Sequence, residues 1–221
     1  MDTKFWIERW EKQQIGFHQK EINGYLKQYW DLARALHPDS QVFVPLSGKS
    51  RDMIWLREQG HEVLGIELSE LAVKDFFAEN GLDFELNEHP HFKPYSCENI
   101  ELLHGDFFSL QKEDLSASHL VYDRAALVAF PPEMRKRYVE HLTAILPEDV
   151  SILLVTMEYP QHEMVGPPFS VPESEVIQLY QQHYNIKTLA SFDIHAENPR
   201  FRERGLSSLQ EKIFHLTSKK E

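Results

Sequence analysis

Short apolar runs alternate with amphipathic helical segments along nearly the whole of this 221-residue chain. Such alternation is typical of βαβ units, in which helices join mainly parallel strands and cover the sheet. Seven runs are predicted as strands: Val42–Leu46, Glu62–Ile66, Ile100–Leu103, His119–Tyr122, Val150–Met157, Ile186–Ile194 and Lys212–Thr217. The pattern predicts an α/β, Rossmann-like fold with a seven-stranded, mostly parallel sheet that ends in an antiparallel hairpin.

Helical periodicity lies between these runs and also before the first of them. We expect helices on both faces of the sheet, over residues 21–36, 51–59, 69–80, 132–146 and 172–183. Ser69 is a plausible N-cap and Gly81 a plausible stop for the third of them. Residues 1–37 are expected to form a helical segment packed on a single domain of residues 1–221, and residues 83–99 to be irregular.

The formal net charge of −12 bears on the partners that the chain can bind. Phosphate contacts supply much of the affinity of nucleic-acid binders, and no long run of Lys or Arg is present, so DNA and RNA are poor candidates. One cysteine, Cys97, leaves no internal disulfide, as expected in the cytoplasm. No apolar stretch reaches the ~18–20 residues of a membrane span. We expect a cytoplasmic monomer that binds a small molecule.

Polar residues and a glycine follow four of the predicted strands, where open α/β sheets bind their ligands. These residues are Gly48, Glu67, Asp106 and Arg124. Glu67 comes 19 positions after Gly48, a spacing typical of the acid that binds a ribose diol. Asp106 could accept from an adenine amino group, with Phe107 beside the ring. Arg124 either binds an anionic group at the ligand site or pairs with Asp123.

Other nucleotide motifs and metal motifs are missing from these turns. Gly48-Lys49-Ser50 resembles the end of a P-loop, but Phe43 stands where that loop needs its first glycine. The dinucleotide motif G-x-G-x-x-G is also absent, which weakens an NAD(P)-dependent oxidoreductase. A single glycine suits a ligand without a pyrophosphate, such as S-adenosylmethionine. The twelve histidines show no H-E-x-x-H and no zinc spacing, so no metal is expected.

A series of motifs over nearly the whole chain resembles the thiopurine S-methyltransferase family, in its bacterial form. The motifs are Trp6-x-x-x-Trp10, Ile15-Gly16-Phe17-His18-Gln19, Val44-Pro45-Leu46-Ser47-Gly48-Lys49, Gly65-Ile66-Glu67-Leu68-Ser69, the stretch from Tyr122 to Ala129, and Gly166-Pro167-Pro168-Phe169-Ser170-Val171-Pro172. The resemblance implies a class I S-adenosylmethionine-dependent methyltransferase that methylates the sulfur of thiopurines or similar thiols and releases S-adenosylhomocysteine. It also implies a link to detoxification and to selenium or tellurium methylation.

The resemblance also assigns roles to particular residues. It implies cofactor contacts from Trp6, Trp10, Leu46, Gly48, Glu67, Asp106, Phe107 and Arg124. It implies acceptor contacts from Phe17, Arg124 and Arg200, with Arg124 as the catalytic residue beside the transferred group. The segment that carries Trp6, Trp10 and Phe17 is expected to act as a lid.

Three residues depart from the family pattern. Ser47 stands where many members have Cys, Ala125 where many have Gly, and Arg204 where some have an aromatic residue. Arg204 makes the expected acceptor pocket more cationic. Two alternatives therefore stay open: a halide or general thiol methyltransferase of the same fold, and a regulator that binds S-adenosylmethionine without catalysis.

Overall fold

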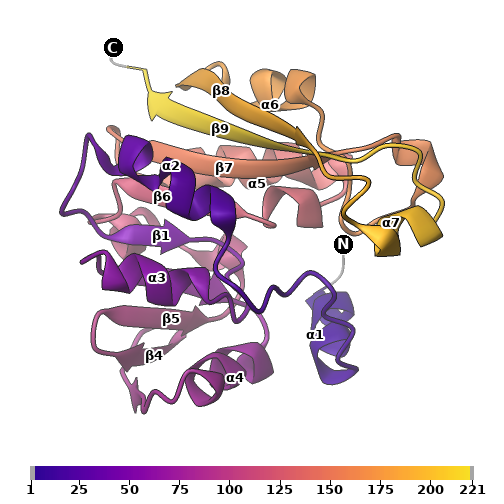
Figure 1. The fold of residues 1–221 in the computed structure, drawn as a ribbon. Coiled ribbons are helices and arrows are strands. Elements are labelled where there is room, and N and C mark those ends of the chain that lie inside the picture. Colours follow the sequence, from indigo (N-terminus) through magenta and orange to yellow (C-terminus); the bar gives the residue numbers. More distant parts are fainter. Residues whose placement is uncertain (1–2, 220–221) are drawn as a thin grey trace.

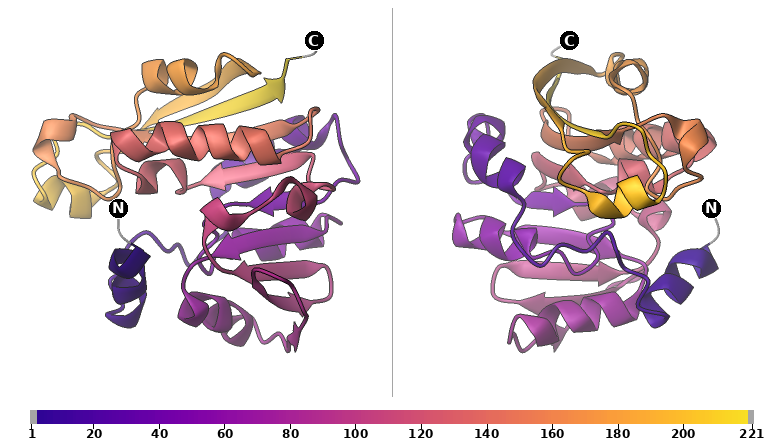
Figure 2. Two further views of the ribbon diagram at one scale, coloured as in Figure 1. Left: turned by 180° about the vertical axis from the view of Figure 1, so that it is seen from behind. Right: turned by 45° about the vertical axis from the view of Figure 1, so that its right-hand side comes forward.

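A computed structural model describes residues 3–219 and contains one nine-stranded sheet with helices on both faces (Figures 1 and 2). The strand order is β3-β4-β5-β2-β1-β6-β7-β9-β8. The five central strands are parallel: β5 (Ile100–His104), β2 (Val63–Glu67), β1 (Val42–Val44), β6 (Leu120–Arg124) and β7 (Ser151–Glu158). The final hairpin of β8 (Tyr184–Asp193) and β9 (Gln210–Ser218) is antiparallel and joins the sheet through β7.

The predicted count of seven strands was wrong, because residues 83–99 add two strands to the β5 edge. These are β3 (Glu85–Leu86) and β4 (Lys93–Cys97), both antiparallel to their neighbours. The β4 sequence contains Pro94, and both residues of β3 are exposed, so neither strand shows the apolar signal of a buried strand. The seven predicted strands are all present, with ends that differ by a few residues.

Two hydrophobic cores lie on opposite faces of the sheet, because successive strand side chains point to opposite sides. One core joins the sheet to α2 (Gly24–Arg34), α3 (Asp52–Glu58) and α4 (Glu70–Glu79). The other joins it to α5 (Pro132–Ile145) and α6 (Glu173–Tyr180). In β1, for example, Val42 and Val44 enter the first core and Phe43 enters the second.

Local signals in the sequence account for the helix ends. The Ser69 hydroxyl accepts from the Ala72 N–H and caps α4, as predicted, and Gly81 follows this helix with φ +65°. The Asn23 side chain accepts from the N–H groups of Tyr25 and Leu26 and caps α2. These caps fix where α2 and α4 begin beside the carboxyl ends of the strands.

Two short helices belong to neither layer. Helix α1 (Thr3–Glu11) and helix α7 (Pro199–Glu203) lie on the same side of the molecule in Figure 1 and in the left-hand view of Figure 2. Both contribute residues to the cavity at the carboxyl ends of the central strands. Elements from the two ends of the chain therefore meet over this edge of the sheet.

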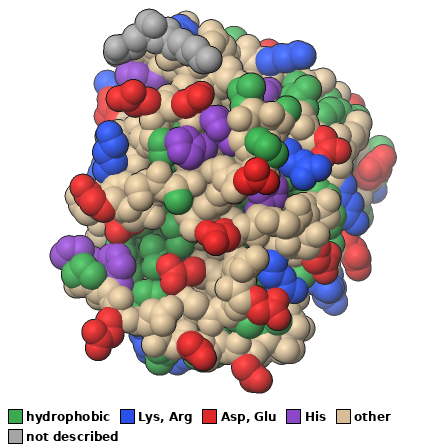
Figure 3. Space-filling model, turned by 90° about the vertical axis from the view of Figure 1, so that its left-hand side faces the viewer, with side chains coloured by type: hydrophobic (Ala, Val, Ile, Leu, Met, Phe, Trp, Pro, Cys, Tyr) green, Lys and Arg blue, Asp and Glu red, His purple; other side chains and the backbone are tan. Residues whose placement is uncertain are grey.

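The surface agrees with the acidic composition. On the face in Figure 3, acidic side chains are spread among basic and hydrophobic ones, and Lys and Arg gather in no continuous tract. Within residues 3–219, no helix has the length and apolar composition needed to cross a membrane.

Candidate active site

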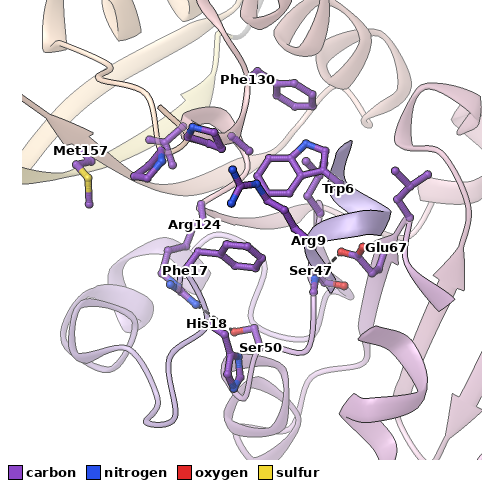
Figure 4. A pocket seen from close by; sticks show the side chains of 18 of the residues that line it. Trp6, Arg9, Phe17, His18, Ser47, Ser50, Glu67, Arg124, Phe130 and Met157 are labelled. Carbon is purple, nitrogen blue, oxygen red and sulfur yellow. Dashed lines mark hydrogen bonds between the residues drawn. The ribbon is translucent and has the colours of Figure 1, made fainter. Parts of the chain in front are cut away.

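A cavity of about 540 Å³ lies at the carboxyl ends of the parallel strands. Its volume is in the range typical of small-molecule sites. All ten residues with a predicted site role line it: Trp6, Trp10, Phe17, Leu46, Gly48, Glu67, Asp106, Phe107, Arg124 and Arg200. Figure 4 shows several of them converging from α1, the strand ends and the intervening loops.

The strand order arranges these residues along the sheet edge. Glu67 ends β2, the turn with Gly48 follows the neighbouring β1, and Arg124 ends β6. Beyond β6 come Met157 of β7 and then Arg200, which follows β8. The cavity therefore has a Glu67 end and an Arg200 end, with Arg124 between them.

Glu67 is buried at the floor of the first end. One carboxylate oxygen accepts from the Gly48 N–H at 2.9 Å and the other from the Ser69 N–H at 2.8 Å. Burial raises the pKa of this carboxyl to about 7, although these backbone N–H groups oppose the shift. A carboxylate offers about four lone-pair sites, so acceptor capacity remains for hydroxyl groups of a ligand.

The turn after β1 has an unusual backbone. Leu46 has φ +46° and Gly48 has φ +54°, so two residues of the turn are left-handed. A Cβ on Gly48 would lie 3.1 Å from the Trp10 ring, so glycine lets this ring close over the turn. Lys49 is anchored to Asp75 and Glu79 of α4 at 3.3 and 2.6 Å, which holds the far side of the turn.

The N-terminal aromatic residues form a wall of the cavity. Phe17 packs edge-on against both Trp6 and Trp10, with ring centroids 5.7 and 5.5 Å apart. Trp10 is only 2% exposed, whereas Trp6 and Phe17 are half-buried. The Trp6 Nε1 is buried and has no hydrogen-bond partner among residues 3–219. A buried donor of this kind can be satisfied by a ligand in the cavity.

Arg124 enters the middle of the cavity and pairs with an acid that the sequence did not indicate. Its Nε donates to Asp52 at 2.9 Å and its Nη2 donates to Ser50 at 3.3 Å. The predicted alternative, pairing with Asp123, was wrong. Asp123 points to the other face of β6, where its carboxylate accepts from the Tyr138 hydroxyl at 2.7 Å.

Asp106 and Phe107 line the cavity from the loop after β5. Asp106 is exposed and accepts from the Phe108 N–H at 2.9 Å, which orders the loop. Phe107 is buried against Tyr138. An acid and an aromatic ring next to each other can bind a planar ligand ring, because the acid accepts its hydrogen bond and the aromatic side chain packs against it.

The Arg200 end is formed by α7 and the N-terminal segment. Arg200 donates to the Gly16 carbonyl at 2.7 Å and so joins residues 184 positions apart. Arg204 also lines the cavity, and no salt bridge holds it within residues 3–219. This end is therefore rich in cationic side chains.

Some lining residues escaped prediction. Arg9 and His18 both line the cavity, and the Arg9 Nε is buried with no hydrogen-bond partner in the described part of the chain. Burial and the nearby Lys49 lower the pKa of His18, which favours the neutral form of its ring. His18 belongs to the Ile15–Gln19 motif but had no predicted role, and Arg9 is one of the unspecified positions between Trp6 and Trp10. Their place in the cavity depends on how residues 3–20 fold back over the sheet. Among residues 3–219, no group of three or more His, Cys, Asp or Glu is arranged to hold a metal ion.

Comparison with solved structures identifies the fold. The chain is similar to the 1,6-didemethyltoxoflavin-N1-methyltransferase of Burkholderia thailandensis, whose structure holds S-adenosylhomocysteine. That likeness has a TM-score of 0.64 at 14% identity and covers 99% of this chain and 87% of the other. The fold is therefore that of the Rossmann-like class I S-adenosylmethionine-dependent methyltransferases.

Sequence comparison defines the family within that class. The model of the thiopurine S-methyltransferase family matches residues 1–219. The thiopurine S-methyltransferase of Nitrosospira multiformis is 52% identical over 219 residues, 99% of each chain. The one of Marinobacter nauticus is 46% identical over 220 residues, 99% of this chain and 100% of the other. The chain belongs to the thiopurine S-methyltransferase family, as its motifs predicted.

Proposed function

We propose that this chain transfers the methyl group of S-adenosylmethionine to the sulfur of thiopurines or similar aromatic and heterocyclic thiols. The observation that carries the proposal is the single cavity with Glu67 at one end, Arg200 at the other and Arg124 between them. One cavity of this shape has room for a nucleoside-bearing cofactor and an acceptor side by side. Family membership supports a thiol as the acceptor.

The Glu67 end fits the nucleoside part of the cofactor. The Glu67 carboxylate keeps lone pairs for the two ribose hydroxyls after it has accepted from Gly48 and Ser69. The left-handed turn at Leu46 and Gly48 lines the cavity and would present its backbone to the methionine part, since Gly48 has no side chain of its own. The Glu67 carboxylate and the turn therefore both suit this part of the cofactor.

The remaining cofactor contacts come from two aromatic sites. Asp106 and Phe107 would bind the amino edge and the face of the adenine. Trp6, Trp10 and Phe17 would cover the bound cofactor and exclude water from the reacting atoms. Phe17 packs edge-on against both tryptophans, which supports a cover made of all three rings.

S-adenosylmethionine, when bound, supplies a methyl group on a sulfonium centre that a thiolate can take by in-line displacement. Arg124 and Arg200 would favour the thiolate, or a polar edge of the acceptor ring, through charge-assisted hydrogen bonds. A soft acceptor of low pKa is already largely anionic, so the protein needs no strong general base. Holding two reactants in line contributes up to ~7–11 kcal/mol, which makes positioning the main contribution of the cavity.

The test is formation of S-adenosylhomocysteine with 6-mercaptopurine as acceptor and hypoxanthine, which carries oxygen in place of the sulfur, as the matched control. We expect product that depends on 6-mercaptopurine and falls sharply in Arg124→Ala. Turnover of halides or simple thiols in preference to thiopurines would instead identify a general thiol or halide enzyme. Tight cofactor binding without turnover of any acceptor, selenium and tellurium compounds included, would contradict an enzymatic role.

A further inference from the structure

Asp52 is a buried acid that three separate parts of the chain share. It is the first residue of α3 and is only 1% exposed. Its Oδ2 accepts from the Arg124 Nε at 2.9 Å and from the Tyr122 hydroxyl at 3.1 Å. Its Oδ1 accepts from the Asn23 N–H at 2.8 Å. One carboxylate therefore connects β6, α3 and the chain that leads into α2.

The contact with Arg124 fixes how this cation faces the cavity. The Arg124 side chain is 13% exposed, and a cation this deeply buried requires a counter-ion. A guanidinium has five N–H donors in one plane, of which Asp52 takes Nε–H and Ser50 takes one on Nη2. With these two donors held, the plane of the group is set, and the side of the guanidinium that lines the cavity can face a ligand.

The contact with Asn23 lies where the N-terminal segment leaves the body of the protein. Asn23 caps α2, whose Leu26 and Trp30 are buried in the core, so the chain beyond it is fixed. The chain before it leads back through Gln19, whose side chain accepts from the Asn23 Nδ2 at 3.3 Å, to Phe17 in the cavity wall. Asp52 thus holds the base of the segment that covers the site.

We propose that Asp52 is a positioning residue for methyl transfer. It acts through Arg124, whose guanidinium it orients, and its second oxygen sets the point from which the N-terminal segment reaches over the cavity. The same carboxylate thereby fixes Arg124 and the cover relative to each other. This inference rests on the proposed role of Arg124 in binding the cofactor or the acceptor.

A double-mutant cycle separates this role from simple support of the fold. The variants are Asp52→Asn, Arg124→Ala and their combination, with Asp31→Asn as a control acid whose partner, Arg34, lies on the surface of α2. The readouts are the dissociation constant of S-adenosylhomocysteine, kcat/KM for 6-mercaptopurine, and Tm. Asp52→Glu is included because it keeps the charge and so guards against loss of the fold.

We expect Asp52→Asn and Arg124→Ala each to lower kcat/KM at least tenfold. The double variant should lose no more than Arg124→Ala alone, because the side-chain oxygen of an asparagine can still accept from the Asn23 N–H and only the contact with Arg124 is removed. Asp52→Glu should stay within about threefold of the wild type, because a carboxylate one methylene longer still reaches the guanidinium. Asp31→Asn should change nothing. Losses that multiply in the double variant, or full activity in Asp52→Asn, would overturn the inference.

The cycle also distinguishes the inference from the proposed function. Wild-type protein that does not methylate 6-mercaptopurine would contradict the proposed function. The cycle would then be evaluated on the affinity for S-adenosylhomocysteine, where the same lack of additivity is expected. Independent effects of Asp52→Asn and Arg124→Ala on that affinity would overturn the positioning role whatever the acceptor.

Discussion

Replacing Gly48 with alanine should damage the cofactor site more than it damages the fold. Gly48 has φ +54°, and a left-handed backbone costs an L-residue about 1–2 kcal/mol. The new Cβ would also lie 3.1 Å from the Trp10 ring, which is 2% exposed and has little space to retreat. Gly81 is a matched control, since its φ is +65° and a Cβ there meets no heavy atom within 4 Å.

Backbone strain should therefore cost both variants about 1 kcal/mol of stability, a fall in Tm of roughly 2–4 °C for a chain of this size, and the contact with Trp10 should lower the Tm of Gly48→Ala somewhat further. Only Gly48→Ala should also displace Trp10 and lower the affinity for S-adenosylhomocysteine at least tenfold, which is about 1.4 kcal/mol of binding free energy. Differential scanning fluorimetry gives the first quantity and isothermal titration calorimetry the second. Equal affinities in Gly48→Ala and Gly81→Ala would refute the assignment of this turn and of Trp10 to the cofactor site.

Three further predictions follow from charge and backbone geometry. Burial raises the pKa of Glu67 to about 7, and the ionised form is the one that accepts from ribose hydroxyls. The affinity for S-adenosylhomocysteine should therefore fall about tenfold from pH 8 to pH 6, and the protein should take up a proton when the ligand leaves. Calorimetry in two buffers measures both quantities, and an affinity that does not change with pH would contradict this role. Ala125 has φ +72°, so Ala125→Gly should raise Tm by roughly 1–2 °C as relief of strain outweighs the added chain entropy, whereas a lower Tm would argue against strain there. Glu175→Gln leaves the fully buried Arg135 without its counter-ion and should cost about 3 kcal/mol, a fall in Tm of roughly 6–12 °C; an unchanged Tm would show that Arg135 does not depend on this pair.

The fold was largely predictable because its central strands are buried on both faces and appear as continuous apolar runs. The edge strands were not. Pro94 lies within β4, and β3 consists of two exposed residues, Glu85 and Leu86, so burial gives them no pattern to read. β4 pairs with β5 and β3 pairs with β4, and no local sequence signal encodes these contacts.

The same contrast holds for the cavity. Gly48, Glu67 and Arg124 could be singled out because the carboxyl ends of parallel strands meet at one edge. Trp10 has the spacing of an ordinary core residue, and only its family resemblance indicated a place in the site. Asp52 is an acid in the first turn of a helix, and a favourable interaction with the helix dipole is enough to explain an acid at that position. Its partners come from distant segments, so its role became visible only in three dimensions.

The most direct test of the account is the affinity of S-adenosylhomocysteine for the wild type, Glu67→Ala and Glu62→Ala. Glu62 is an exposed acid just before β2, and Glu67 ends the same strand in the cavity. Hydrogen bonds to a charged group contribute about 1.5–3 kcal/mol, so Glu67→Ala should weaken binding at least tenfold. Glu62→Ala should bind as the wild type does. Unchanged affinity in a folded Glu67→Ala would contradict the placement of the cofactor in this cavity.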